Sequence, residues 1–197
     1  MIPDKFTCLL SKVKCKFTVD ADDLKSFRNL KACAVRWSAG PSIAIMPYGL
    51  ELAGLSPSPL TIQEPKNKKN CFKYYYDHEV LVGVDVYGAS GDEIEWEVFQ
   101  LDGNESFCLR LDDDDEVVRV SGVMYNNGRP EIACRFEEDG EYWCYEYEYE
   151  RDQAVSMRVY ATNSAPGTRI YIDKEAEELM GLYFYNGSSK VYVYRRN

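Results

Sequence analysis

Alternation of apolar and polar residues dominates the chain from Cys71 onward and predicts β-strands. Runs with a period of two are separated by short turns rich in Gly, Asn and Asp. The predicted strands lie near residues 71–76, 79–87, 93–101, 105–111, 116–125, 131–138, 141–150, 154–161 and 168–172. Because the turns are short, successive strands should be antiparallel neighbours. The sequence therefore predicts a mainly β (α+β) fold, an antiparallel meander of hairpins that forms a sandwich, an open barrel or an extended sheet.

The hairpin of residues 131–150 has the clearest pattern. Asp139-Gly140 suits a two-residue type I′ turn, and counting outward pairs Phe136 with Trp143 and Cys134 with Tyr145. In this register, one face is apolar and forms core: Ile132, Cys134, Phe136, Trp143, Tyr145 and Tyr147. The other face is largely acidic: Arg135, Glu137, Tyr142, Cys144, Glu146 and Glu148, with Glu150 continuing the row. Cys134 and Cys144 then point to opposite faces and should not form a disulfide.

Two rows of glutamates follow from this strand pattern. The first consists of Glu146, Glu148 and Glu150, and the second of Glu93, Glu95 and Glu97. Only Arg135 lies among the carboxylates of the hairpin, and like charges close together on a sheet are destabilising. The rows are therefore either solvated faces or a surface that contacts a partner.

Two short helices are predicted at opposite ends of the meander. Asp20 is a good N-cap for a helix over residues 21–31, with apolar residues at three-residue steps. Asp173 similarly precedes a predicted helix that ends near Met180. A hairpin of residues 182–185 and 191–194 around Asn186-Gly187-Ser188 completes the chain.

The first 55 residues predict a basic β-α-β-β opening. Residues 13–19 alternate as a strand does, and residues 32–37 and 43–46 form two strands after the helix. Residues 49–55 suit a short strand and a helical turn equally well. The segment 56–70 is polar, contains Ser56-Pro57-Ser58-Pro59 and lacks periodicity, which predicts a loop. A single domain over residues 1–197 is favoured, with this loop as the candidate boundary between a basic part (1–55) and an acidic part (71–197).

The stretch KCKFTVDADDLKSFRNL resembles the first strand and helix of a sliding-clamp domain of DNA replication. In that family, an extended strand leads into a basic helix that faces DNA, and no residue role is transferred to this chain from the resemblance. The resemblance covers only the opening of the chain, because the meander from Cys71 is not what the family requires.

Charge is distributed unevenly along the 197 residues. The net charge is −10, but residues 1–73 contain 12 Lys and Arg against 6 Asp and Glu. The remaining residues are strongly acidic, which disfavours nonspecific binding to nucleic acid or anionic membranes through that part. The seven cysteines are odd in number, scattered and without a C-x-x-C pair, which favours reduced thiols. No apolar run reaches the length of a membrane span, so a soluble, cytoplasmic protein without membrane contact is expected.

Catalytic and metal-binding motifs are weak in this sequence. His78 is the only histidine and forms no familiar pattern with its neighbours, so a surface-loop histidine is expected. The DDDDE run of residues 112–116 lacks the spacing of a calcium-binding loop and suits a solvated turn. No cofactor motif and no catalytic set is identified.

The leading hypothesis is a non-enzymatic acidic binding or inhibitory protein that engages a basic protein partner, like toxin-immunity proteins or nucleic-acid mimics. Its partner-binding residues would be Glu93, Glu95, Glu97, Glu146, Glu148 and Glu150. One alternative is a module that contacts nucleic acid through basic residues of the N-terminal part: Lys25, Arg28, Lys31, Lys66, Lys68 and Lys69. Another is a carboxylate-based enzyme of unknown reaction. The oligomeric state is not predicted.

Overall fold

The structure is a computed structural model that describes residues 2–196, except for the side chain of Leu30. A single sheet contains all the strands, and each strand is hydrogen-bonded to the next in chain order. The strands are β1 (Ala34–Ser38), β2 (Phe72–Asp77), β3 (Val80–Tyr87), β4 (Glu93–Asp102), β5 (Glu105–Asp112), β6 (Val117–Asn126), β7 (Arg129–Glu137), β8 (Tyr142–Glu150), β9 (Gln153–Ala161), β10 (Thr168–Glu175), β11 (Glu178–Asn186) and β12 (Ser189–Arg195).

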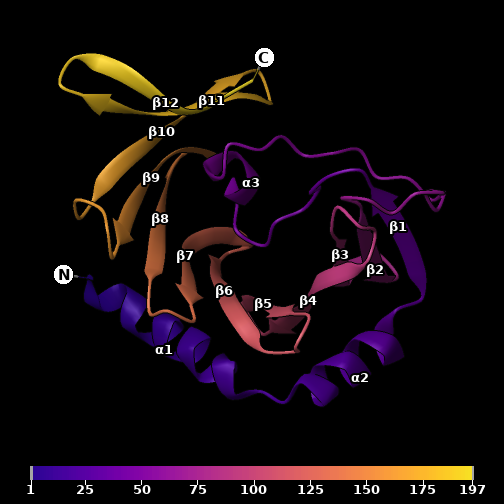
Figure 1. The fold of residues 1–197 in the computed structure, drawn as a ribbon. Coiled ribbons are helices and arrows are strands. Elements are labelled where there is room, and N and C mark those ends of the chain that lie inside the picture. The colour runs from indigo at the N-terminus through magenta and orange to yellow at the C-terminus, as the bar shows by residue number, and fades with distance from the viewer. Residues whose placement is uncertain (1, 197) are drawn as a thin grey trace.

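This arrangement confirms the mainly β antiparallel meander. All pairings are antiparallel, and the sheet is open because β1 and β12 form its two edges. The sheet is strongly curled (Figure 1), so that it has a convex and a concave face. The loop 56–70 is present as predicted, and β1 before it pairs with β2 after it, so both parts of the chain contribute to one sheet.

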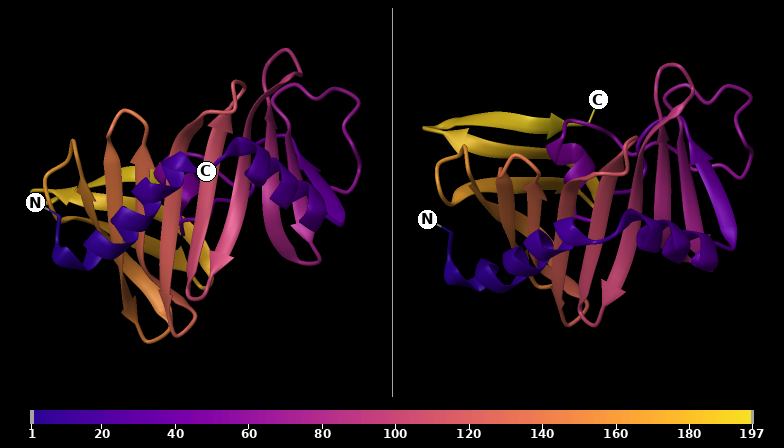
Figure 2. Two further views of the ribbon diagram at one scale, coloured as in Figure 1. Left: turned by 90° about the horizontal axis from the view of Figure 1, so that it is seen from below. Right: turned by 60° about the horizontal axis from the view of Figure 1, so that its bottom comes forward.

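The helical elements lie on both faces of the curled sheet. They are η1 (Asp4–Phe6), α1 (Thr7–Cys15), η2 (Lys16–Thr18), α2 (Ala21–Lys31) and α3 (Gly49–Leu52). α1 and α2 cross the strands on the convex face, whereas α3 and its flanking segment lie inside the curl (Figures 1 and 2). No helix among residues 2–196 is both long enough and apolar enough to cross a membrane.

The strand predicted at residues 13–19 is wrong, because this segment belongs to α1 and η2. Phe6, Leu9, Leu10 and Val13 are spaced by three or four residues and are all buried against the sheet. The alternation of apolar and polar residues after Val13 therefore does not form a strand, because the helical spacing of the apolar residues up to Val13 outweighs it. The β-α-β-β opening and the strand that resembled a sliding clamp are therefore absent.

The helix at 21–31 is confirmed, and Asp20 caps it by accepting a hydrogen bond of 2.8 Å from the backbone N–H of Asp22. The first strand after the helix is also confirmed, as β1. The strand predicted at residues 43–46 is wrong, since these residues have no strand partner and lie over the concave face. Residues 49–52 form a helical turn, which settles the ambiguity there.

The helix predicted at residues 173–180 is also wrong. These residues form a hairpin between β10 and β11, with Ala176 at a positive φ of 55° in the turn. Tyr171 of β10 is directly opposite Tyr183 of β11, and the two rings stack with their centroids 5.4 Å apart. This cross-strand packing outweighs the N-cap signal of Asp173. The closing hairpin around Gly187 is confirmed as β11 and β12.

The register of the hairpin 131–150 differs from the prediction by one residue. The N–H of Glu137 donates to the carbonyl of Glu141 at 2.9 Å, and Gly140 has a φ of +90°. The loop is therefore a three-residue turn instead of a type I′ turn. As a result, Cys134 pairs directly with Cys144 and their Sγ atoms lie 3.0 Å apart as free thiols. The prediction that they occupy opposite faces is wrong.

Both faces of the sheet contain apolar core. Beneath α1 and α2, the convex core includes Phe107, Leu109, Val120 and Cys134. On the concave face, a second core around Tyr145, Tyr147 and Leu182 packs against Met46 of the segment before α3. The sheet is therefore a layer between two coverings, of which the concave one is much shorter.

Candidate functional site

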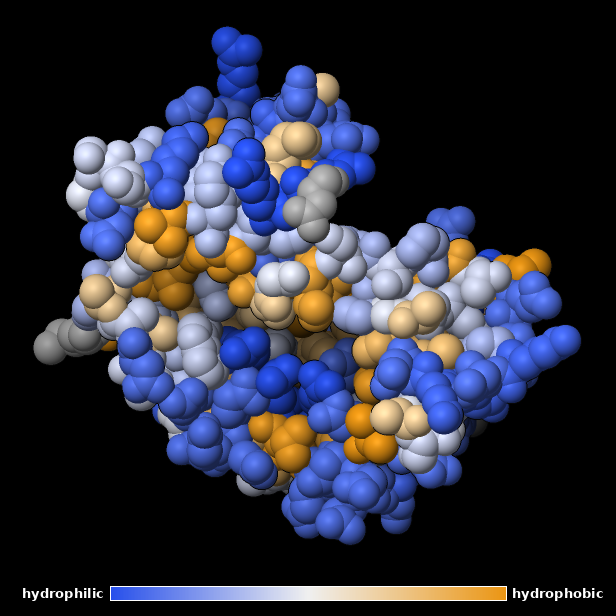
Figure 3. All heavy atoms as spheres, turned by 45° about the horizontal axis from the view of Figure 1, so that its top comes forward, coloured by the Kyte–Doolittle hydropathy of each residue, from blue (hydrophilic) through white to orange (hydrophobic). Residues whose placement is uncertain are grey.

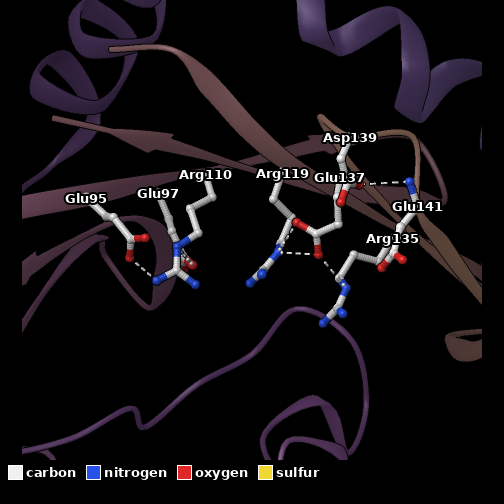
Figure 4. A network of polar contacts seen from close by, with 8 residues as sticks. All are labelled: Glu95, Glu97, Arg110, Arg119, Arg135, Glu137, Asp139 and Glu141. Atoms are coloured by element: carbon white, nitrogen blue, oxygen red, sulfur yellow. Dashed lines mark hydrogen bonds and ion pairs between the residues drawn. The ribbon is translucent and has the colours of Figure 1, made fainter. Parts of the chain in front are cut away.

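The structure divides the predicted partner-binding glutamates between the two faces. Glu95 and Glu97 lie on the concave face beside Arg110, whereas Glu146 lies on the convex face in an ion pair with Lys5 of η1. Figure 4 shows Glu95 and Glu97 on the same side of the strands as Arg110. The two predicted rows therefore do not form one continuous surface.

Neighbouring strands supply cations that the hairpin sequence alone does not reveal. Glu148 contacts Arg158 of β9 at 2.8 Å and Arg169 of β10 at 2.9 Å, and it accepts a hydrogen bond of 2.5 Å from Ser156. These contacts lower the pKa of Glu148, although its partial burial opposes the shift. Glu150 is exposed at the end of β8. The row on β8 is thus largely neutralised.

The six basic candidates of the N-terminal part are also separated. Arg28 is buried in an ion pair with Asp85, Lys25 pairs with Asp115, and Lys68 pairs with Glu64 at 2.8 Å. The other three are exposed: Lys31, Lys66 and Lys69. Three of the six therefore already have carboxylate partners within the chain.

A more concentrated acidic surface lies at one edge of the sheet. The turns β5–β6 and β7–β8 are adjacent there, since the N–H of Glu138 donates to the carbonyl of Val118 at 3.1 Å. We call the carboxylates of these two turns the acidic edge: Asp112, Asp113, Asp114, Asp115, Glu116, Glu138, Asp139 and Glu141. Within residues 2–196, Asp115 alone among them forms an ion pair, with Lys25.

The adjacency of these two turns could have been predicted from the sequence. In a meander, every second turn lies on the same edge of the sheet. The DDDDE turn and the Glu138–Glu141 turn are two turns apart, so they must lie side by side. The solvated turn expected at residues 112–116 is confirmed.

The concave face contains a cluster of arginines that sequence analysis missed. Arg110, Arg119 and Arg135, which we call the arginine floor, come from β5, β6 and β7 and project to the same side of the sheet (Figure 4). Arg119 Nε donates to both carboxylate oxygens of Glu137, at 2.8 and 2.9 Å. Arg135 lies over the ring of Trp143, with 4.3 Å between its Cζ atom and the ring centroid. Trp143, predicted to be core, is half-buried on this face.

Burial shapes the electrostatics of this cluster. It raises the pKa of Glu97, although Arg110 and Arg119 oppose the shift, because burial disfavours the charged carboxylate. Burial also lowers the pKa of Arg135, and the positive charge of Arg119 adds to this effect. The floor is thus a desolvated region in which arginines repel one another.

Other chemistry-bearing residues do not gather into a site. His78 is a surface-loop residue as expected, with 91% of its side chain exposed and its Nε2 atom 3.8 Å from Asp77. Within the part of the chain that the structure describes, no group of three or more His, Cys, Asp or Glu residues is arranged to hold a metal ion.

Comparison with protein-family models, curated proteins and solved structures finds no match to the chain. Its function is therefore argued from its own geometry.

Proposed function

We propose that the protein is a non-enzymatic acidic binding protein that engages a basic protein partner through its acidic edge, as in the toxin-immunity or nucleic-acid-mimic classes. The observation that supports this proposal is the density of unpaired carboxylates on two adjacent turns. Of the eight that form the edge, only Asp115 has a cation partner among the described residues. Elsewhere on the sheet, Glu95, Glu146 and Glu148 all have one.

The physical reason is that unpaired charges are poor at stabilising a fold but effective in association. Clustered carboxylates repel each other and destabilise the compact state, whereas their summed field accelerates encounter with a basic surface. A partner that places Lys or Arg side chains against both turns would relieve the repulsion. The proposal thus moves the expected partner surface from the strand faces to the adjoining turns.

The test is charge reversal at the edge. The variant D113K/D114K/E116K/E138K adds eight positive charge units at exposed positions, so its free energy of unfolding should change little. The parent protein and the variant are immobilised, lysate proteins are captured and eluted with salt, and a basic protein retained only by the parent is identified. Its association rate is then measured with purified partner across ionic strength. The variant should associate at least about tenfold more slowly at low salt.

A matched control changes the same charge at the opposite edge. D102K/E131K/E150K/E175K alters four exposed acids that form no ion pair among the described residues, including Glu150 of the row predicted from the sequence. This control should retain most of the parental association rate. Equal slowing in both variants would show that net charge matters and the acidic edge does not. Capture of nucleic acid instead of a basic protein would contradict the proposal.

A further inference from the structure

A cavity of about 250 Å³ lies between the arginine floor and the segment that covers it. Its floor includes Arg110, Arg119, Ser121 and Arg135, and its roof is formed by residues 41–55 with α3. Figure 3 shows this side of the molecule as hollowed, with hydrophobic and hydrophilic residues meeting in the hollow. The cavity therefore combines a charged floor with an apolar roof.

Several hydrogen-bond donors of the floor have no acceptor within the described residues. Arg110 Nε and Arg135 Nε are buried and lack a hydrogen-bond partner. Arg135 Nε lies 3.0 Å from Glu137 Oε1, but the N–H does not point at that oxygen. Arg119 uses Nε for Glu137, which leaves its two terminal nitrogens without a protein acceptor. Buried donors without acceptors cost stability, so an acceptor placed in the cavity would be favourable.

The register adds a second reason to expect an anion. Arg110 of β5 is directly opposite Arg119 of β6, and like charges in directly opposite positions are destabilising. Glu137 is shared between Arg119 and Arg135. Glu97 lies 4.0 Å from Arg110 and is the carboxylate nearest the cavity. The lining of the cavity thus contains three arginines but a single carboxylate, that of Glu97.

The roof limits what kind of anion fits. Ile43, Met46 and Leu50 line the cavity opposite the arginines, so a bare inorganic anion would leave the apolar half unfilled. We propose that the cavity binds a small organic monocarboxylate, with its carboxylate on Arg119 and Arg135 and its apolar body under the roof. A planar guanidinium matches a carboxylate with two parallel hydrogen bonds. Ser121, which is buried beside Arg135, offers a further hydroxyl donor.

A single negative charge suits the balance of this site better than two. Glu95 and Glu137, outside the cavity lining, also pair with Arg110 and Arg119, so the three arginines face three carboxylates in all. A monocarboxylate adds one negative charge to this nearly balanced cluster, whereas a phosphate dianion would add two. This inference is independent of the acidic edge, which lies on the turns outside the cavity.

The test is isothermal titration calorimetry of the full chain with benzoate, phenylacetate and hexanoate. At least one of these acids should bind at a single site with a dissociation constant of about 1 mM or lower, which is within reach of ligands of this size. Benzamide, a neutral analogue of benzoate, and inorganic phosphate should bind at least about tenfold more weakly, because each lacks either the charge or the apolar body.

Variants test whether binding requires the guanidinium groups of the arginine floor or only positive charge. R119K/R135K keeps the charge but removes the planar forks, and should weaken binding at least about tenfold, equivalent to losing one charge-assisted hydrogen bond. R158K/R169K makes the same change on the convex face and should bind as the parent does. L50W fills the roof without changing charge and should also abolish binding. Circular dichroism confirms that each variant is folded.

Three results would overturn the proposal. They are the absence of saturable binding by all three acids, equal affinity for benzamide or phosphate, and unchanged affinity in both R119K/R135K and L50W.

Discussion

Two arginines on opposite faces of the sheet are held in different ways. On the convex face, Arg28 projects from α2 toward the sheet, where its Nη1 atom pairs with Asp85 and its guanidinium lies about 5 Å from the ring centroids of Tyr75 and Trp96. On the concave face, Arg135 shares Glu137 with Arg119 and forms no hydrogen bond with it. Both arginines lie over aromatic rings and both have a buried Nε without an acceptor among the described residues. Arg28 donates to a buried carboxylate, whereas Arg135 does not and lines the cavity.

The coverings of the two faces explain this difference. η1, α1, η2 and α2 lie on the convex face and bring apolar residues such as Phe6, Val13 and Leu24 into full burial. The concave face is covered only by residues 41–55, whose one helix is a single turn. A short roof cannot fill a strongly curled face, so the polar residues of β5–β7 remain next to a cavity. The comparison therefore predicts that the convex face stabilises the fold and the concave face is available for binding.

The largest expected effect is the removal of a convex core side chain. Phe6 is completely buried, with its ring centroid 5.3 Å from that of Tyr160. F6A should therefore lower the free energy of unfolding by about 3–5 kcal/mol. L50A in the half-buried roof should cost only about 1 kcal/mol, the usual size for a single substitution. Urea denaturation measures both, and equal losses would mean that the roof is as important to the fold as the core under the N-terminal helices.

The two arginines provide the next comparison. R28M leaves Asp85, with only 3% of its side chain exposed, without its cation, and should cost about 3–5 kcal/mol. R135M leaves Glu137 still bonded to Arg119, so it should change the free energy of unfolding by about 1 kcal/mol or less. Urea denaturation at neutral pH again gives both values. A loss of several kcal/mol for R135M would show that the concave charges are structural.

The strands were predictable from the sequence because each one depends on local alternation. Every predicted strand from residue 71 to residue 172 is present, as β2 to β10. Local sequence patterns predicted the wrong element where packing between different segments determines the secondary structure. The helical spacing of Phe6, Leu9 and Val13 indicates a buried helix face only when the sheet against which these residues pack is known. The N-cap at Asp173 was overridden by tyrosine packing between β10 and β11.

The sites were less predictable than the strands because they depend on register. A one-residue error in the register of the 131–150 hairpin moves the side chains of one strand to the opposite face. The prediction therefore placed Trp143 on the wrong face and Cys134 and Cys144 on opposite faces. The apparent lack of cations beside Glu148 had a similar origin, since Arg158 and Arg169 belong to later strands. The arginine floor requires the relative register of three strands. The first of these relations depends on the conformation of a single turn, and the others join residues of different strands.

The smallest predicted effect is the pH dependence of folding stability at two glutamates, Glu97 and Glu148. Glu97 has a raised pKa in the folded state, so its stabilising contribution is present below the unfolded pKa of about 4.3 and is lost as the pH rises through the folded pKa. Glu148 has a lowered pKa, so its contribution is present above about 4.3 and is lost as the pH falls through the folded pKa. The two glutamine substitutions should therefore act in opposite directions.

At pH 7, E97Q should raise the melting temperature and E148Q should lower it, each by about 2–4 °C if the effect is near 1 kcal/mol. The E97Q difference should shrink as the pH is lowered toward 4, because the parental Glu97 then becomes protonated. The E148Q difference should persist to about pH 4 and shrink only below it, because the pKa of Glu148 is lowered. Thermal melts across this pH range measure the effect. Shifts of the same sign at pH 7 would contradict the contrast between Glu148, whose charge is stabilised by its arginine partners, and Glu97, whose charge is disfavoured by burial.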